Sequence, residues 1–164
     1  MTNCRPPYFP MMIDIYGKDV LIVGGGNIAS RRADTLLRCG AKVIIIAPEI
    51  RCEGSVLVLR EFQPEDITEN LSLVIAATNR RDINRLVHDT AKAKGIPVNV
   101  CDCQSECDFF FPSLINHENI AVSVCSAGMS SSLTHRLSNK LREVWAVWVS
   151  EEMKSETAAK KLNP

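Results

Sequence analysis

The stretch Asn99–Ser113, NVCDCQSECDFFFPS, sets three cysteines among acidic and aromatic residues. Thiolates can bind a metal or act as a redox pair, whereas a carboxylate in a partly apolar cleft can accept a proton. The cysteines follow the spacing C-x-C-x₃-C, which matches neither the paired C-x₂₋₄-C ligands of structural zinc sites nor a C-x-x-C redox motif. We therefore predict no metal site. The stretch by itself does not decide whether Asp102 caps the loop or takes part in the chemistry of a site.

A second stretch with chemical potential is the glycine run in VLIVGGGNIASRR, where Gly24, Gly26 and Ala29 form G-x-G-x-x-A. Gly24 permits a tight turn, Gly26 lets a pyrophosphate approach the backbone, and Ala29 lets a helix and a strand pack closely. The motif follows an apolar run and opens a helical segment, whose first N–H groups can bind phosphate. This setting favours a dinucleotide site over a flexible turn.

The residues that would distinguish NAD from NADP are ambiguous. Many NAD-binding folds carry an acid at the end of the second strand, where it binds the ribose 2′-hydroxyl. Here that strand runs into Ala47 and Pro48, and Glu49 follows late. Arg31 and Arg32 either reach a phosphate or only solvate a helix face. The choice between NAD and NADP therefore stays open on these residues.

Apolar runs alternate with amphipathic segments, which predicts an α/β fold with a doubly wound, Rossmann-type parallel sheet. Runs that are apolar on both faces are typical of strands in such a sheet. We expect strands over 18–23, 42–47, 55–62, 71–78 and 97–100, and helices over 27–40 and 80–95. Beyond them, residues 109–115 and 119–126 predict an antiparallel hairpin, and 130–149 predict a long helix. The sequence thus divides into an NAD-binding domain, 1–112, and a hairpin-plus-helix region, 113–164.

The composition excludes several classes of protein. The chain has 164 residues and a formal net charge of zero, so no global field attracts nucleic acid or an anionic membrane. No run approaches the ~18 apolar residues of a membrane helix, and the first ten residues show no secretory signal. Seven cysteines without such a signal indicate a reducing compartment, so we expect a cytoplasmic location.

Five blocks occur in one order: YFPMMIDIYGKDVLIVGGGNIASRRADTLLRCGAKVIIIAPE, LVIAATNRRDINRLV, GIPVNVCD, CDFFFPSLI and IAVSVCSAGMSSSL. Together they resemble the N-terminal domain of the siroheme synthase family, the precorrin-2 dehydrogenases and sirohydrochlorin ferrochelatases. The resemblance covers residues 8–142 and implies an enzyme, an NAD-dependent precorrin-2 dehydrogenase that forms sirohydrochlorin. It corresponds to a short, monofunctional form without the methyltransferase domain. Some members also insert ferrous iron, and the resemblance leaves that activity open.

The resemblance also assigns residues. The block V-N-V-x-D places the family's catalytic aspartate at Asp102, whose role as base or as substrate-positioning group stays open. Ser126 falls on a substrate-loop position, and Ser130 and Arg136 are further candidates for binding the substrate's carboxylates. The same serines have an alternative role as helix caps. The implied cofactor contacts are Gly24, Gly25, Gly26, Asn27, Ile28, Thr78 and Asn79.

The chain departs from the family at the loop before the last helix. The family usually reads G-G-x-S-P, whereas here Ala127 replaces a glycine and Ser131 replaces the proline. We therefore expect the loop into the last helix to differ in shape from that of the family. Arginines at 80, 81 and 85 either bind substrate carboxylates or form a solvated helix face.

A different class of function is a regulatory dinucleotide-sensing module without chemistry. It would explain the glycine loop but not the hairpin, the serine-rich loop or Asp102. We also expect a homodimer, because the last helix carries an apolar stripe too large for the sheet to cover. That stripe consists of Leu133, Leu137, Leu141, Val144, Trp145 and Trp148. The expected partners are therefore a tetrapyrrole substrate and a second copy of the chain, with NAD as the cofactor.

Overall fold

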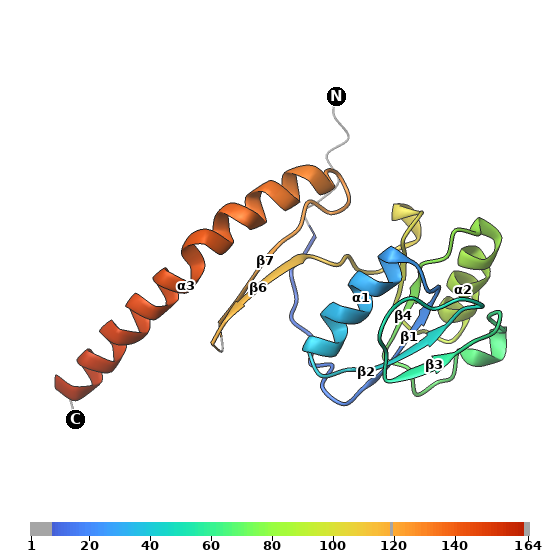
Figure 1. Ribbon diagram of the computed structural model, residues 1–164, viewed down its shortest axis with the longest axis horizontal. Coiled ribbons are helices and arrows are strands. Elements are labelled where there is room, and N and C mark those ends of the chain that lie inside the picture. The colour runs from blue at the N-terminus through green and yellow to red at the C-terminus, as the bar shows by residue number, and fades with distance from the viewer. Residues whose placement is uncertain (1–7, 119, 163–164) are drawn as a thin grey trace. The chain divides into compact units, whose positions relative to one another are not determined.

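The computed structural model describes residues 8–118 and 120–162 (Figure 1). The chain forms two compact units, the first ending at Phe109 and the second beginning at Phe110. The first unit contains the glycine run and Asp102, and the second contains the serine-rich loop. No helix in the described ranges is both long enough and apolar enough to cross a membrane.

The first unit is built on one five-stranded parallel sheet, which confirms the predicted Rossmann-type architecture. Its strands lie in the order β3-β2-β1-β4-β5. The order reverses between β1 and β4, and such switch points are where open α/β sheets bind ligands. The strands are β1 (Asp19–Val23), β2 (Lys42–Ile46), β3 (Val56–Val58), β4 (Leu73–Ala76) and β5 (Val98–Val100).

Two of the connections between the strands of this sheet are α-helices. Helix α1 (Asn27–Arg38) joins β1 to β2, and α2 (Arg81–Ala93) joins β4 to β5. The two connections run in opposite directions along the sheet, so right-handed crossovers place the helices on opposite faces. Ala29 is completely buried on α1, in agreement with the predicted need for close helix–strand packing. Two short 3₁₀ turns, Pro64–Asp66 and Gln104–Glu106, complete the unit.

The strands are shorter than the apolar runs predicted. The third was expected over 55–62 but ends at Val58, which pairs with Ile46, the last residue of β2. An edge strand has a single neighbour, so its ladder stops where that neighbour stops. The fourth was expected over 71–78 but ends at Ala76, whose partners Val23 and Val100 also end their strands. The residues that follow Ala76 therefore form a turn at the carboxyl ends of the strands.

The second unit is a hairpin and a long helix, as predicted. Strand β6 (Ser113–His117) pairs antiparallel with β7 (Ile120–Val124), and α3 covers Ser131–Leu162. The hairpin begins four residues later than expected, and Glu118 follows β6 with a φ of 51°. The helix was predicted to end at residue 149, but the next residues, rich in Glu, Lys and Ala, are good helix formers and extend it.

Candidate functional site

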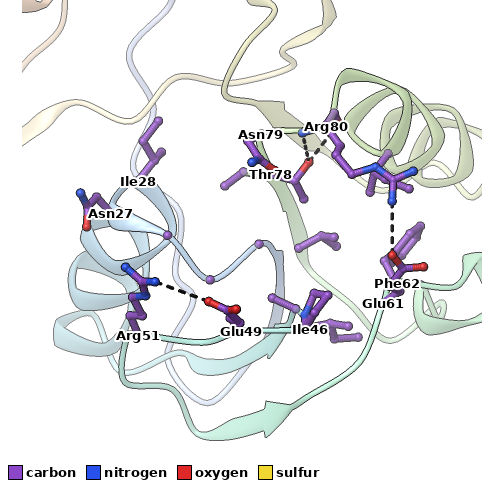
Figure 2. A pocket seen from close by; sticks show the side chains of 18 of the residues that line it. Asn27, Ile28, Ile46, Glu49, Arg51, Glu61, Phe62, Thr78, Asn79 and Arg80 are labelled. Atoms are coloured by element: carbon purple, nitrogen blue, oxygen red, sulfur yellow. Dashed lines mark hydrogen bonds and ion pairs between the residues drawn. The ribbon is translucent and has the colours of Figure 1, made fainter.

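A cleft of about 820 Å³ opens beside the carboxyl ends of β1, β2 and β4 in the first unit (Figure 2). Its position coincides with the switch point of the sheet. The structure brings all seven predicted cofactor residues to its wall: Gly24, Gly25, Gly26, Asn27, Ile28, Thr78 and Asn79. Their contact with a cofactor stays a prediction.

The first two glycines hold the loop against its neighbours. Gly24 has a φ of +121°, and a Cβ there would lie 2.6 Å from the carbonyl carbon of Ala77. A Cβ on Gly25 would lie 2.8 Å from the Cα of Ile50. Both contacts are with backbone atoms, which cannot move aside as a side chain can. These two positions therefore need glycine for the loop to pack between the ends of β2 and β4.

Gly26 has a different environment. A Cβ built there has no heavy atom within 4 Å, and the backbone is extended, with a φ of −87°. Gly26 is the N-cap of α1 and supplies no side-chain hydrogen bond to the first turn. The free N–H groups of a helix N-terminus favour an anion, and the missing Cβ leaves room for one. The geometry therefore fits the pyrophosphate of a dinucleotide.

The wall formed by the end of β2 carries charged residues. Glu49 and Arg51 form an exposed ion pair at 3.4 Å, which Figure 2 shows beside the glycine loop. Arg31 also lines the cleft. Arg32 does not: it is half-buried, where burial lowers its pKa, and it hydrogen-bonds Cys101. Of the two arginines considered as phosphate ligands, only Arg31 lies in place for that role.

The turn after β4 is held by a residue that sequence reasoning missed. Asn84 is completely buried on α2. Its Oδ1 accepts hydrogen bonds from Thr78 N (3.1 Å) and Thr78 Oγ1 (2.7 Å), and its Nδ2 donates to Thr78 O (3.1 Å). Asn84 shares the buried stripe of α2 with Val87 and Ala91, at positions i, i+3 and i+7. The signal in the sequence that would have identified Asn84 is a polar residue on an otherwise apolar helical stripe.

The arginines after β4 pair with acidic side chains at the surface, and substrate binding by them stays a prediction. Arg80 pairs with Glu61 (3.3 Å) and Asp82 (2.7 Å), and these hydrogen-bonded acids raise its pKa. Arg81 and Arg85 both pair with Glu106, Arg85 at 3.0 Å. The hydrogen bond from Arg81 lowers the pKa of Glu106 below its ordinary 4.5.

Asp102 lies beyond the end of β5, at the same sheet edge as the cleft but not among its lining residues. The N–H of Cys101 donates to Ala76 O at 2.9 Å, which extends the β4–β5 pairing by one residue. The side chain of Asp102 is 35% exposed, and its Oδ1 lies 3.3 Å from Arg81 Nη1. Arg81 therefore links Asp102 to Glu106.

The cysteine-rich loop is tied to β5 by its own side chains. Cys107 Sγ accepts a hydrogen bond from Val100 N (3.2 Å), and Asp108 Oδ2 accepts one from Val98 N (3.0 Å). Burial raises the pKa of the Cys107 thiol, which favours its neutral form. No cluster of three or more His, Cys, Asp and Glu side chains in the described residues is suited to hold a metal ion. Cys107 therefore packs as a structural thiol.

The serines of the second unit form a capping network. Ser126 Oγ accepts from Ser130 N (3.0 Å) and from Thr134 Oγ1 (3.0 Å), and it donates to Ser130 O. Ser130 Oγ accepts from Leu133 N at 3.2 Å and so caps the start of α3. Arg136 is exposed on α3. The structure thus brings Ser126 and Ser130 together as caps, and substrate binding by these three residues stays a prediction.

Comparisons with known proteins agree with this architecture. Residues 11–113 match a family described as "Putative NAD(P)-binding". The chain is 40% identical over 145 residues to the "Probable multifunctional siroheme biosynthesis protein HemA" of Ruminiclostridium josui, covering 83% of this chain and 28% of that protein. It is 37% identical over 141 residues to the siroheme synthase of Pseudoalteromonas translucida, which covers 82% of this chain and 30% of that protein.

The chain spans less than a third of the length of these curated relatives. It also matches a solved structure of "SirC, precorrin-2 dehydrogenase" with a TM-score of 0.74 and 24% identity. That match covers 96% of this chain and 83% of the other. The two proteins therefore share the fold of both units, including the hairpin and the long helix.

Proposed function

Because the chain belongs to this NAD(P)-binding family, we propose that it is an NAD-dependent precorrin-2 dehydrogenase that forms sirohydrochlorin in siroheme biosynthesis. The observation that carries the proposal is the open space over Gly26, in a cleft at the same carboxyl edge of the sheet as Asp102. The names of the relatives support the pathway, and the solved structure supports the fold.

The reaction removes two electrons and two hydrogens from the tetrapyrrole, one as a hydride and the other as a proton. Bound NAD⁺ supplies the hydride acceptor. Gly26 and the first turn of α1 bind the pyrophosphate, and the turn after β4 lines the opposite wall. Asp102 either takes up the proton or positions the substrate, and its ion pair with Arg81 holds its carboxylate in place.

We assign the substrate's carboxylates to Arg136, through its exposed guanidinium, and to Ser126 and Ser130, through the start of α3 that these two serines cap. A homodimer is part of the proposal, because α3 leaves large apolar side chains exposed: Leu133 is 43% exposed, Leu137 45% and Trp148 53%. Sedimentation velocity at micromolar concentration should show a dimer, and a monomer would reject this part. Among the described cysteines all are free thiols, in keeping with a cytoplasmic location.

An anaerobic assay with precorrin-2 and NAD⁺ tests the activity. We expect NADH and sirohydrochlorin to form in equal amounts, with no NADH when precorrin-2 is omitted. Ferrous iron added afterwards tests chelatase activity, which the proposal leaves open. The alternative is a dinucleotide-sensing module, for which NAD⁺ would bind without any NADH being formed. That result would replace the enzymatic assignment.

A further inference from the structure

The turn after β4 contains two predicted cofactor residues with different surroundings. Every hydrogen-bonding group of Thr78 is engaged within the protein: its backbone N–H and C=O bind Asn84. Its hydroxyl lies 2.7 Å from Asn84 Oδ1 and accepts from Arg80 N at 3.1 Å. Thr78 therefore lines the cleft, but its polar groups already form hydrogen bonds within the protein (Figure 2).

Asn79 has the opposite character. It is exposed and lines the same cleft. Its side chain forms no hydrogen bond with any residue in the ranges 8–118 and 120–162, so its amide retains both donors and an acceptor. Of the two residues, Asn79 has the polar groups to offer a ligand in the cleft.

The burial of Asn84 needs an explanation. A buried side-chain amide is costly unless it is hydrogen-bonded, and the rest of its helical stripe is apolar. The three hydrogen bonds of its side chain all go to Thr78, six residues earlier in the chain. Through them, α2 determines the backbone path of the turn, and hence the place from which Asn79 projects.

We propose that Asn84 is a positioning residue for the cofactor: it fixes Thr78 so that Asn79 presents its amide to the bound dinucleotide. In this arrangement Asn79 makes the polar contact and Thr78 makes only a surface contact. The inference rests on dinucleotide binding from the proposed function, and not on oxidation of a tetrapyrrole.

Titration calorimetry of the full chain with NAD⁺ tests the proposal. Asn84→Leu keeps the branching and the number of side-chain heavy atoms but removes all three side-chain hydrogen bonds, and we expect at least about tenfold weaker NAD⁺ binding. Asn84→Asp keeps the acceptor for Thr78 N–H and Oγ1–H, so it should recover part of the affinity. Asn79→Ala should weaken binding by about tenfold, and Thr78→Val should weaken it less.

The matched control is Val87→Ala, one turn along the same helix and equally buried. It should lower the unfolding temperature as a core truncation does, while NAD⁺ affinity stays within about twofold of the wild type. A purely structural role for Asn84 predicts that affinity follows the loss of stability in both variants. Equal affinity losses in Val87→Ala and Asn84→Leu would therefore overturn the proposal.

Three further outcomes are decisive. If Asn84→Leu does not fold, a greater loss in Thr78→Val than in Asn79→Ala would still reject the assignment, and the reverse order would support it. If the wild type does not bind NAD⁺, both the cofactor and this role of Asn84 are rejected. If NAD⁺ binds but precorrin-2 is not oxidised, only the proposed reaction fails, and the affinities still decide the role of Asn84.

Discussion

Substitutions along the glycine loop should separate binding from folding. At Gly26, a Cβ meets no atom within 4 Å, and the φ of −87° suits any residue. Gly26→Val therefore adds no steric strain, and the weaker N-cap costs about 1 kcal/mol of folding free energy. The valine methyl groups project into the space that we assign to the pyrophosphate. We expect NAD⁺ affinity to fall by at least about 100-fold, or about 2.7 kcal/mol.

Gly24→Ala should instead lower the stability of the fold. The added Cβ would lie 2.6 Å from the carbonyl carbon of Ala77 and 3.0 Å from the nitrogen of Thr78, so the ends of β1 and β4 must separate. The φ of +121° adds backbone strain of about 1–3 kcal/mol. Overpacking adds about 1–3 kcal/mol, so the free energy of unfolding should fall by about 2–6 kcal/mol.

Urea unfolding measures the stability of both variants, and calorimetry with NAD⁺ measures their binding. The expected pattern is a stable Gly26→Val that does not bind and an unstable Gly24→Ala. A folded Gly26→Val with wild-type NAD⁺ affinity would refute the assignment of the pyrophosphate to this loop. A Gly24→Ala variant as stable as the wild type would refute the packing argument.

Three other predictions test separate parts of the molecule. Asp102→Asn should retain NAD⁺ binding but lose about 10²–10⁴-fold in anaerobic turnover, whereas the double variant Cys101→Ser and Cys103→Ser should turn over at nearly the wild-type rate. The reverse pattern would favour the thiols as the reactive groups. Ala127 has a φ of 51°, so Ala127→Gly should raise the free energy of unfolding by about 0.5–1 kcal/mol, and a lower melting temperature would contradict this. The hydrogen bond from Arg81 lowers the pKa of Glu106, so the contribution of Glu106 to stability is complete above pH 4.5 and is lost as the pH falls through the lowered value. In Glu106→Gln, urea unfolding should therefore show a smaller decrease in the free energy of unfolding below pH 4.5 than in the wild type. An unchanged decrease would be evidence against the ion pair.

Local patterns in the sequence were sufficient to predict the fold. The runs at 18–23 and 42–47 are apolar on both faces and end beside glycine or proline, so they specify buried parallel strands without knowledge of their partners. The strand ends were less predictable. Val58 and Ala76 end their strands because their neighbours end there, and the length of a neighbour is a property of the assembled sheet.

In the candidate site, too, some features could be predicted from local sequence and others depend on packing between distant segments. Glycine at 24 and 26 could be identified from spacing alone, because both act through a missing Cβ within one strand–turn–helix unit. The pairing of Thr78 with Asn84 could not be identified, because helix α2 must first pack on the sheet before a buried amide meets that turn. The ion pair of Asp102 joins residues 21 positions apart, Arg81 on α2 and Asp102 in the turn after β5.

The sequence by itself therefore determined the architecture, the glycine loop and the residues that resemble a precorrin-2 dehydrogenase site. Only the tertiary structure decided which of those residues have free polar groups. Cys107, Thr78 and Ser126 are engaged in hydrogen bonds within the protein, whereas Asn79 lines the cleft with its amide exposed. The physical reason is that spacing along the chain specifies side-chain type and local geometry, but hydrogen-bond partners are chosen by packing between distant segments.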